Sequence, residues 1–172
     1  ITHRNYDRID NVSVFLIASP IIKKWHPQLT IGLQKQWMDI EHNSRMLSMD
    51  RPLFIGRFNN GIQFPYGWTL HVDLFFQGKG DFQNIYINKN VFMMDASLTK
   101  SFFDDRLSFN LQGIDLTHGR KDGNVIYNKH MDLTVNNVTD SREVRLTVRY
   151  KFNTTKNKYK GKGAAEEEIR RL

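Results

Sequence analysis

Apolar and polar residues alternate with a period of two in the last patterned stretch of the chain, residues 144–152. The apolar positions are Val144, Leu146, Val148, Tyr150 and Phe152. The residues between them are polar, and three of the four are cations. Because successive side chains of a β-strand point to opposite faces, this pattern predicts a strand with one apolar and one polar face.

The same alternation recurs upstream, most clearly in residues 68–77. There Leu70, Val72 and Leu74 share one face, while His71 and Asp73 lie on the other. Further strands are predicted at residues 11–19, 28–37, 54–63 and 107–112 and within 86–100, with β character within 125–136. In residues 11–19 the alternation is blurred, so the facing of that strand stays open. The pattern predicts about seven strands and no convincing helix.

The predicted connections fall into two kinds. Those at residues 20–27, 64–67 and 102–105 are short and aromatic, whereas residues 38–52, 78–84 and 117–142 are mostly longer and hydrophilic. The first group contains a proline-glycine sequence at 64–67 that suits a type I turn, and residues 121–124 carry a hairpin signal. Short turns at one end and long loops at the other are typical of transmembrane β-barrels.

Aromatic residues gather at the short-turn ends of the predicted strands, and they include Trp25, Tyr66, Trp68, Phe102 and Phe103. Amphipathic rings are favoured where hydrocarbon meets water, so these residues are candidates for an interfacial girdle. The alternative is the general preference of aromatic residues for strand ends in any β-protein. The predicted fold class is all-β, an antiparallel up-and-down meander forming a segment of a transmembrane outer-membrane β-barrel over residues 1–152. Residues 153–172 are predicted to be a polar tail.

Composition narrows the picture only a little. The 172 residues carry a net charge of +7 and no cysteine, so a disulfide framework and a thiolate metal site are absent. The basic residues are scattered except for one dense run at 151–162, which argues against nucleic acid as a partner. A mean hydropathy of −0.54 is compatible with a membrane barrel, because its apolar residues stand at alternate positions. No secretory signal precedes Ile1, which leaves a cytoplasmic protein or the tail of a longer precursor open.

No catalytic or metal-binding set stands out. None of the six histidines lies three to five residues from another, so a helical zinc pair is absent. His71 and Asp73 share a polar face and form a possible ligand pair, although a solvated wall is the favoured interpretation. Asp104 and Asp105 are expected to act as turn formers. The sequence therefore predicts no enzyme activity, no metal and no cofactor.

The polar faces of the strands are the other candidate site, because in a barrel they would line the lumen. The residues expected there include Gln34, Arg57, Asn59, His71, Asp73, Asp95, Asn110, Arg145 and Arg149. In a barrel filled by a plug they would contact the plug and line the path of a substrate.

The closing stretch, Ser-Arg-Glu-Val-Arg-Leu-Thr-Val-Arg-Tyr-Lys-Phe-Asn at 141–153, is followed by a lysine-rich segment at 155–163 and an Arg-Arg-Leu end. It resembles the C-terminus of Bacteroidetes outer-membrane β-barrel proteins related to TonB-dependent receptors. The Pro65–Trp68 turn with residues 70–76, and the hairpin-like stretch 97–109, are similar to segments of the same family.

The resemblance implies a longer protein with a signal peptide, a small N-terminal β-domain, a plug and further barrel strands. It also implies nutrient uptake or binding, outer-membrane lipid and a TonB-type energising protein as partners, and recognition of the terminal strand by the barrel-assembly machinery.

Two readings of other classes stay open. A soluble carbohydrate-binding module would use Trp25, Trp37 and Trp68 as stacking platforms, and a periplasmic or surface structural protein would bind no ligand. One geometric expectation separates them from a barrel. In the barrel, residues such as Leu70, Val72, Leu146 and Val148 face lipid, whereas in a sandwich they lie beneath a second layer.

Overall fold

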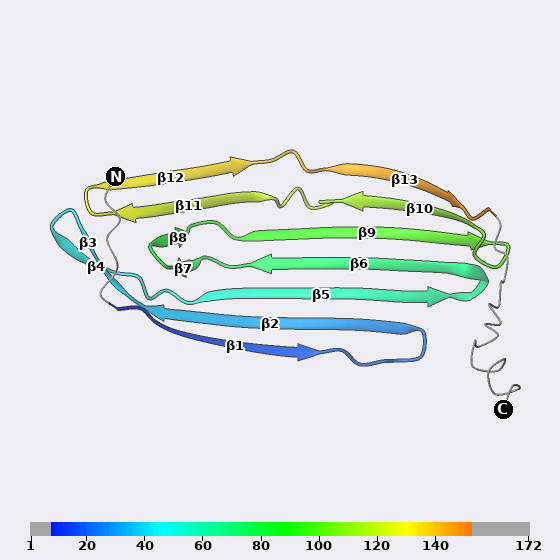
Figure 1. Cartoon of the computed structure of the whole chain (residues 1–172), viewed down its shortest axis with the longest axis horizontal. Helices are drawn as coiled ribbons and strands as arrows, with labels where there is room; N and C mark the ends of the chain where they lie inside the picture. The colour runs from blue at the N-terminus through cyan, green and yellow to red at the C-terminus, as the bar shows by residue number, and fades with distance from the viewer. Residues whose placement is uncertain (1–7, 153–172) are drawn as a thin grey trace, which may run out of the picture.

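A computed structural model of the chain describes residues 8–152, and its main body is one antiparallel sheet of seven strands (Figure 1). The strands are β1 (Asp10–Ala18), β2 (Trp25–Trp37), β5 (Leu53–Phe64), β6 (Trp68–Gln77), β9 (Val91–Phe102), β10 (Leu107–Ile114) and β13 (Glu143–Tyr150). Their spatial order follows the chain. The predicted all-β, up-and-down meander is confirmed.

Shorter strands prolong this sheet at its long-loop end (Figure 1). A four-stranded sheet is made of β7 (Gly80–Phe82), β8 (Ile85–Ile87), β11 (Lys121–Asn128) and β12 (Met131–Val138), and β3 (Asp39–His42) pairs with β4 (Arg45–Ser48). β12 lies in line with β13, and β11 in line with β10. The long connections are therefore continuations of the strands beyond the main sheet.

Three sequence predictions at this end are wrong. Residues 38–52 are a β3–β4 hairpin instead of a loop, and residues 78–84 contain β7 and the turn into β8. The hairpin signal at 121–124 lies inside β11, and the turn falls at Lys129 and His130. Gly123 serves there for close approach, because a Cβ would collide with the side chains of Asn88 and Lys89.

The short-turn end also differs in detail. Trp25 to Pro27 begin β2, and a bridge between Ile22 and Trp25 closes the turn before it. The turn at 65–67 is a 3-10 turn in which Tyr66 has a φ of 62°, which excludes type I. The predicted short turn after Phe102 is confirmed, with a positive φ at Phe103, Asp104 and Asp105.

Cross-strand register keeps the two faces of the sheet separate. Ile62 pairs with Leu70, Leu70 with Leu98, Leu98 with Leu111, and Leu111 with Leu146. One continuous apolar row therefore crosses five strands. The neighbouring polar row runs through His71, Ser97, Gln112 and Arg145 in the same way. A slip of one residue in any strand would move its polar set to the apolar face.

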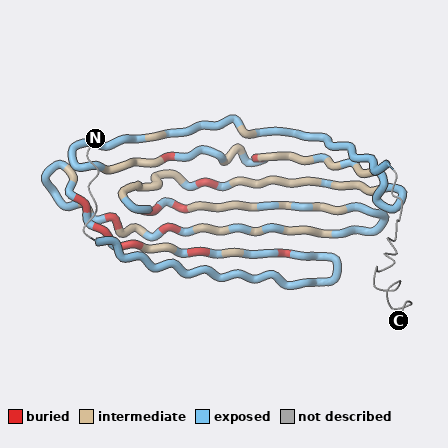
Figure 2. Tube along the Cα trace, in the orientation of Figure 1, coloured by how far each residue is buried: buried red, intermediate tan, exposed pale blue. Residues whose placement is uncertain are grey.

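The main sheet is a single layer, so its apolar face is uncovered. Leu146 and Val148 are 64% and 55% exposed, and Figure 2 shows the main strands as intermediate or exposed along most of their length. Within residues 8–152 no second sheet or helix lies over Leu70, Val72 and Leu74. No helix of this region has the length and apolar character needed to cross a membrane. The layered arrangement of a sandwich is absent from the described chain.

Burial is concentrated instead at the long-loop end (Figure 2). Met38, Ile40 and Met49 form a small apolar cluster against Leu47, Tyr86 and Tyr127. These residues come from the β3–β4 hairpin and from the short strands β8 and β11. The hairpin is thereby packed onto the extended strands as a second, local layer.

Buried polar groups hold the same region. The side-chain amide of Gln36 donates to the carbonyls of Met49 (3.1 Å) and Gln83 (2.7 Å) and accepts from the Gln83 N–H (2.7 Å). Asp81 is fully buried and receives the Arg51 guanidinium at 2.9 Å and the Arg51 backbone N–H at 2.9 Å. The carbon at the centre of that guanidinium also lies 3.6 Å from the ring centroid of Tyr86.

Asp81 also sets the ionisation of its partner. Burial lowers the pKa of Arg51, but the hydrogen bond and negative charge of Asp81, together with Tyr127 and Tyr86, raise it above its ordinary value. The Arg51 guanidinium therefore stays charged beside Asp81.

Polar contacts at the tip then join this hairpin to the β11–β12 turn. His42 lies 3.1 Å from an Asp132 oxygen, Lys129 pairs with Glu41 at 2.8 Å, and the Asn43 N–H donates to the Lys129 carbonyl. The long-loop end is consequently one connected unit, even though its strands are far apart in sequence.

Replacing Arg51 by methionine tests the buried ion pair. Because R51M leaves the Asp81 carboxylate buried and unpaired, we expect the local stability of the β3–β4 hairpin to fall by about 3–5 kcal/mol. Hydrogen exchange of the hairpin amides measures the change. The exposed Arg45 gives a matched control, and R45M should change protection by less than about 1 kcal/mol. Equal effects of R51M and R45M would contradict the interpretation.

Candidate functional site

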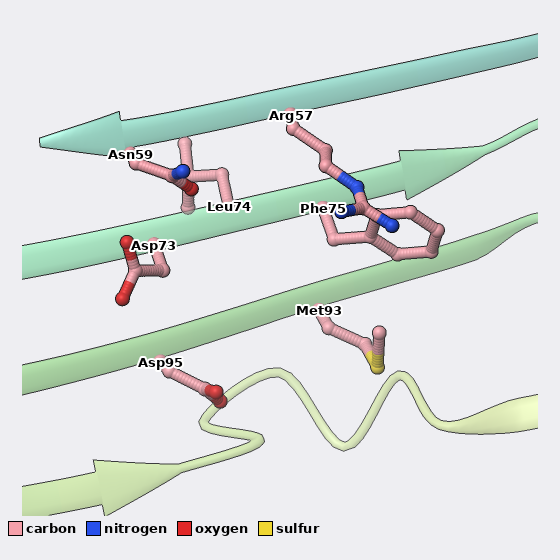
Figure 3. A pocket seen from close by; sticks show the side chains of 7 residues that line it. All are labelled: Arg57, Asn59, Asp73, Leu74, Phe75, Met93 and Asp95. Atoms are coloured by element: carbon pink, nitrogen blue, oxygen red, sulfur yellow. The ribbon is translucent and has the colours of Figure 1, made fainter. Parts of the chain in front are cut away.

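A shallow cavity of about 290 Å³ lies on the polar face in the middle of the main sheet. Its lining comes from three neighbouring strands: Arg57 and Asn59 of β5, Asp73, Leu74 and Phe75 of β6, and Met93 and Asp95 of β9 (Figure 3). The site is thus built from strand positions, not from loops.

Sheet register places these side chains in two adjacent rows. Arg57 pairs with Phe75, and Phe75 pairs with Met93, which gives a cation, an aromatic ring and a thioether in line. The next polar-face row runs from Asn59 through Asp73 to Asp95, an amide followed by two carboxylates. Because alternate residues of each strand share a face, all six side chains stand on the same side of the sheet.

The first row has an apolar floor with a positive charge above it. The Arg57 guanidinium lies 5.3 Å from the ring centroid of Phe75, and Figure 3 shows the two side chains over one another. This is a cation–π contact, which orients the guanidinium. Among the described residues no carboxylate lies within ion-pair distance of Arg57.

The second row places two negative charges opposite each other. Asp73 and Asp95 are direct cross-strand partners, an arrangement that destabilises an antiparallel pair when both are ionised. Asp95 accepts the backbone N–H of Asp115 at 2.7 Å. No described residue supplies a hydrogen bond or a counter-cation to Asp73.

Asp115 connects the cavity to the chain that follows β10. Its carboxylate is buried and accepts the Gly119 N–H at 2.7 Å and the Ser141 hydroxyl. These bonds hold residues 115–120 against the strand extension beside the cavity. The Asp95 carboxylate is therefore held by a backbone N–H, whereas no described residue holds the Asp73 carboxylate.

Chemically, this arrangement suits non-covalent recognition. An aromatic floor with planar hydrogen-bonding groups around it can receive a solute that has an apolar face and a polar edge. The described residues contain no group of three or more histidine, aspartate or glutamate side chains placed to hold a metal ion. The geometry supports binding and orientation of a solute on the polar face.

Of the predicted polar-face residues, four meet in the cavity: Arg57, Asn59, Asp73 and Asp95. His71 lies in the next row, where its ring packs over Gly61, and makes no contact with Asp73 that would form a ligand pair. The remaining predicted residues, Gln34, Asn110, Arg145 and Arg149, share the same face on other strands. Asn110 donates to Thr99 at 2.7 Å and Arg145 pairs with Glu143 at 2.8 Å, so both have local partners.

Sequence reasoning did not select Phe75 and Met93 as site residues. The signal for Phe75 is an apolar side chain in the otherwise polar phase of β6. The signal for Met93 is weaker, because Val91 also stands in the polar phase of β9. In a sheet with one polar face, such a residue marks a place where an apolar surface is wanted.

The predicted aromatic girdle and terminal strand occupy the expected ends of the sheet. Trp25, Tyr66, Trp68, Phe102 and Phe103 all lie at or next to the short turns. Within residues 8–152, β13 pairs only with β10, and its apolar row Val144, Leu146, Val148 and Tyr150 is exposed. Phe152 lies two residues beyond the strand, with its ring centroid 4.6 Å from that of Tyr150. Their roles in the membrane and in assembly stay predictions.

Comparison with known proteins adds one finding. A family model described as the outer membrane protein beta-barrel family matches residues 1–150. No curated protein and no solved structure matches the chain.

The carboxylate row gives a stability test of the cavity. Because D73N removes the repulsion between directly opposed carboxylates, we expect it to stabilise the ligand-free protein by about 0.2–1 kcal/mol. The reverse change at the neighbouring position, N59D, adds a carboxylate to the same row and should destabilise by a similar amount. Urea unfolding in detergent measures both, and a loss of stability in D73N would contradict the arrangement.

Proposed function

The chain belongs to the outer membrane protein β-barrel family, and from this premise we propose that it forms the C-terminal part of a receptor or transporter related to TonB-dependent receptors. The protein lies in the outer membrane. Its proposed activity is the binding or uptake of a nutrient too large for a general pore. We propose no catalytic activity for the chain.

The observation that carries the proposal is a single-layer sheet with one mainly apolar face, one mainly polar face and a solute-sized cavity on the polar one. In a membrane barrel the apolar face meets lipid and the polar face lines the interior. The cavity then lies inside the barrel, where a passing or bound solute would contact Arg57, Asp73 and Phe75.

Strand direction supports the idea that more strands complete the barrel. β1 and β13 are the edges of a seven-stranded antiparallel sheet, so they run in the same direction, as Figure 1 shows. Antiparallel neighbours at both edges must run the opposite way. A second copy in the same membrane orientation presents edges that run the same way as β1 and β13, so it cannot close the barrel antiparallel.

An odd number of further strands closes the sheet with an even total, as bacterial barrels have. The resemblance of the sequence supports additional strands and a plug within the same protein. Lipid cannot satisfy the unpaired backbone groups of β1 and β13, so closure is also an energetic requirement.

Two partners complete the proposal. A TonB-type protein would energise uptake, and the barrel-assembly machinery would recognise β13 through its apolar row and Phe152. The support for the second is the open edge of β13, because an exposed edge can template strand addition while alternate side chains fill pockets.

The carbohydrate-binding alternative is not supported, because the three tryptophans do not lie together as one stacking surface. Trp37 ends β2 at the long-loop end, whereas Trp25 and Trp68 begin strands at the short-turn end. The three rings therefore cannot stack against one sugar chain of modest length.

Deletion of the gene tests the proposed function. We expect the deletion strain to lose uptake of at least one nutrient from a panel of peptides, glycans and metal chelates, and we expect the same loss when the TonB-type protein is removed. Uptake measured with labelled compounds gives the readout. Recovery of the full-length protein in the soluble fraction without detergent would sink the proposal.

Neighbouring residues of β6 test which face meets lipid. V72R places a cation in the middle of the apolar face and should cost about 2–4 kcal/mol in vesicles, because a charge at mid-bilayer depth loses its hydration. H71R places the same side chain on the polar face and should change stability by less than about 1 kcal/mol. Urea titration of the refolded protein measures both variants, and a reversed order would assign the faces the other way.

A further inference from the structure

Charged side chains are rare on the apolar face of the seven main strands. By alternation and register, Asp10, Lys35 and Lys100 share this face with the apolar rows. Asp10 is the first residue of β1 and pairs with Arg8 at 2.8 Å. The two lysines are therefore the charges that need an explanation, and they stand near opposite borders of the face.

Lys100 lies in a cluster of aromatic and carbonyl partners at the short-turn border. Its ammonium lies 5.1 Å from the ring centroid of Trp68 and 5.0 Å from that of Phe102, and it donates to the Tyr66 carbonyl. Trp68 is its direct cross-strand partner. The described chain places no carboxylate within ion-pair distance of Lys100.

The conformation of the turn before β6 allows these contacts. Gly67 has a φ of 74°, and a Cβ there would lie 2.8 Å from the Ser101 carbonyl oxygen, so only glycine lets the turn sit this close to β9. The Tyr66 carbonyl is thereby brought to the ammonium. Lys35 has no comparable surroundings, with a single ring, Trp37, at 5.2 Å and no carbonyl acceptor.

An ammonium between two rings at this depth can neutralise an anion from the membrane. Two of its N–H groups remain after the bond to Tyr66, and the aromatic rings lie where lipid headgroups begin. The short-turn end of the sheet as a whole is basic, because Lys23, Lys24, Arg106 and Lys151 outnumber Asp104 and Asp105. In an outer-membrane barrel the short turns face the periplasm, so the adjoining leaflet is made of glycerophospholipids.

We propose that Lys100, Trp68 and Phe102 bind the phosphate-bearing headgroup of an anionic glycerophospholipid in the leaflet on the short-turn side. Lys100 pairs with the phosphate, and the two rings pack on the glycerol and upper acyl region. The site lies on the opposite face of the sheet from the cavity around Arg57 and Asp73. It fixes the depth of the hairpins β5–β6 and β9–β10 in the membrane and is independent of transport.

Lipid retention tests the site in the natural protein that contains this chain. The protein is refolded in vesicles of phosphatidylcholine with one fifth phosphatidylglycerol by design, extracted gently, and weighed with its bound lipids by native mass spectrometry. We expect K100M to retain about fivefold less phosphatidylglycerol than the wild type, the effect of ~1 kcal/mol for one lysine at an anionic surface. K100R should retain it.

The matched control is K24M, which removes the same charge from the same short-turn end but from the turn before β2. We expect K24M to retain phosphatidylglycerol as the wild type does. If K24M loses as much as K100M, diffuse surface charge explains the retention and the site is wrong. Unchanged retention in K100M also overturns the proposal.

Two further measurements keep the test decisive. K100Q is measured alongside K100M, and both variants should show the same loss of retained phosphatidylglycerol. The shift of the folded band on unheated gels checks that each variant is folded. Inorganic phosphate at millimolar concentration is added to wild-type protein before extraction. Retention that survives this competition supports a lipid headgroup, whereas full displacement assigns the site to free phosphate and overturns the proposal.

Discussion

Cross-strand register is the constraint on which the rest of this structure depends. A single-layer sheet has no second layer to bury its apolar side chains, so its two faces stay distinct only while every strand keeps its phase. The row from Ile62 through Leu70 and Leu98 to Leu146 shows that this phase is held across the sheet. In lipid the same ladders satisfy the backbone, which makes pairing and facing one requirement.

Several residues that break the phase have specific partners. Asn60 on the apolar face receives the indole N–H of Trp25, and Lys100 lies between two rings and a carbonyl. On the polar face, Phe75 lies under Arg57. These exceptions to the alternation coincide with specific contacts, whereas Phe15 and Ile17 stand exposed on the polar face of the edge strand β1.

The sequence predicted the elements that alternation alone determines and failed where tertiary contacts decide. The bounds of β6 agree with the predicted strand at residues 68–77, because every second residue from Trp68 to Phe76 is apolar. Alternation does not predict β3, β4 and β7, because these strands have only three or four residues each. The contacts that hold them, such as Arg51 with Asp81, come from distant segments of the chain. The hairpin predicted at 121–124 is wrong for the same reason. Gly123 is explained by its close approach to Asn88 and Lys89 and does not form a turn.

Several polar-face residues have local partners within the fold, and this distinguishes them from Asp73 in the cavity. Asn110 is bonded to Thr99, Arg145 is paired with Glu143, and Gln36 ties the long-loop hairpin in place. Asp73 differs, because it faces Asp95 across the ladder and the described chain offers it no counter-charge. Sequences violate local rules mainly where function requires it. Within the row from Asn59 to Asp95, Asp95 accepts the Asp115 N–H, so Asp73 is the residue whose charge the described contacts leave unexplained and for which we propose a role in binding.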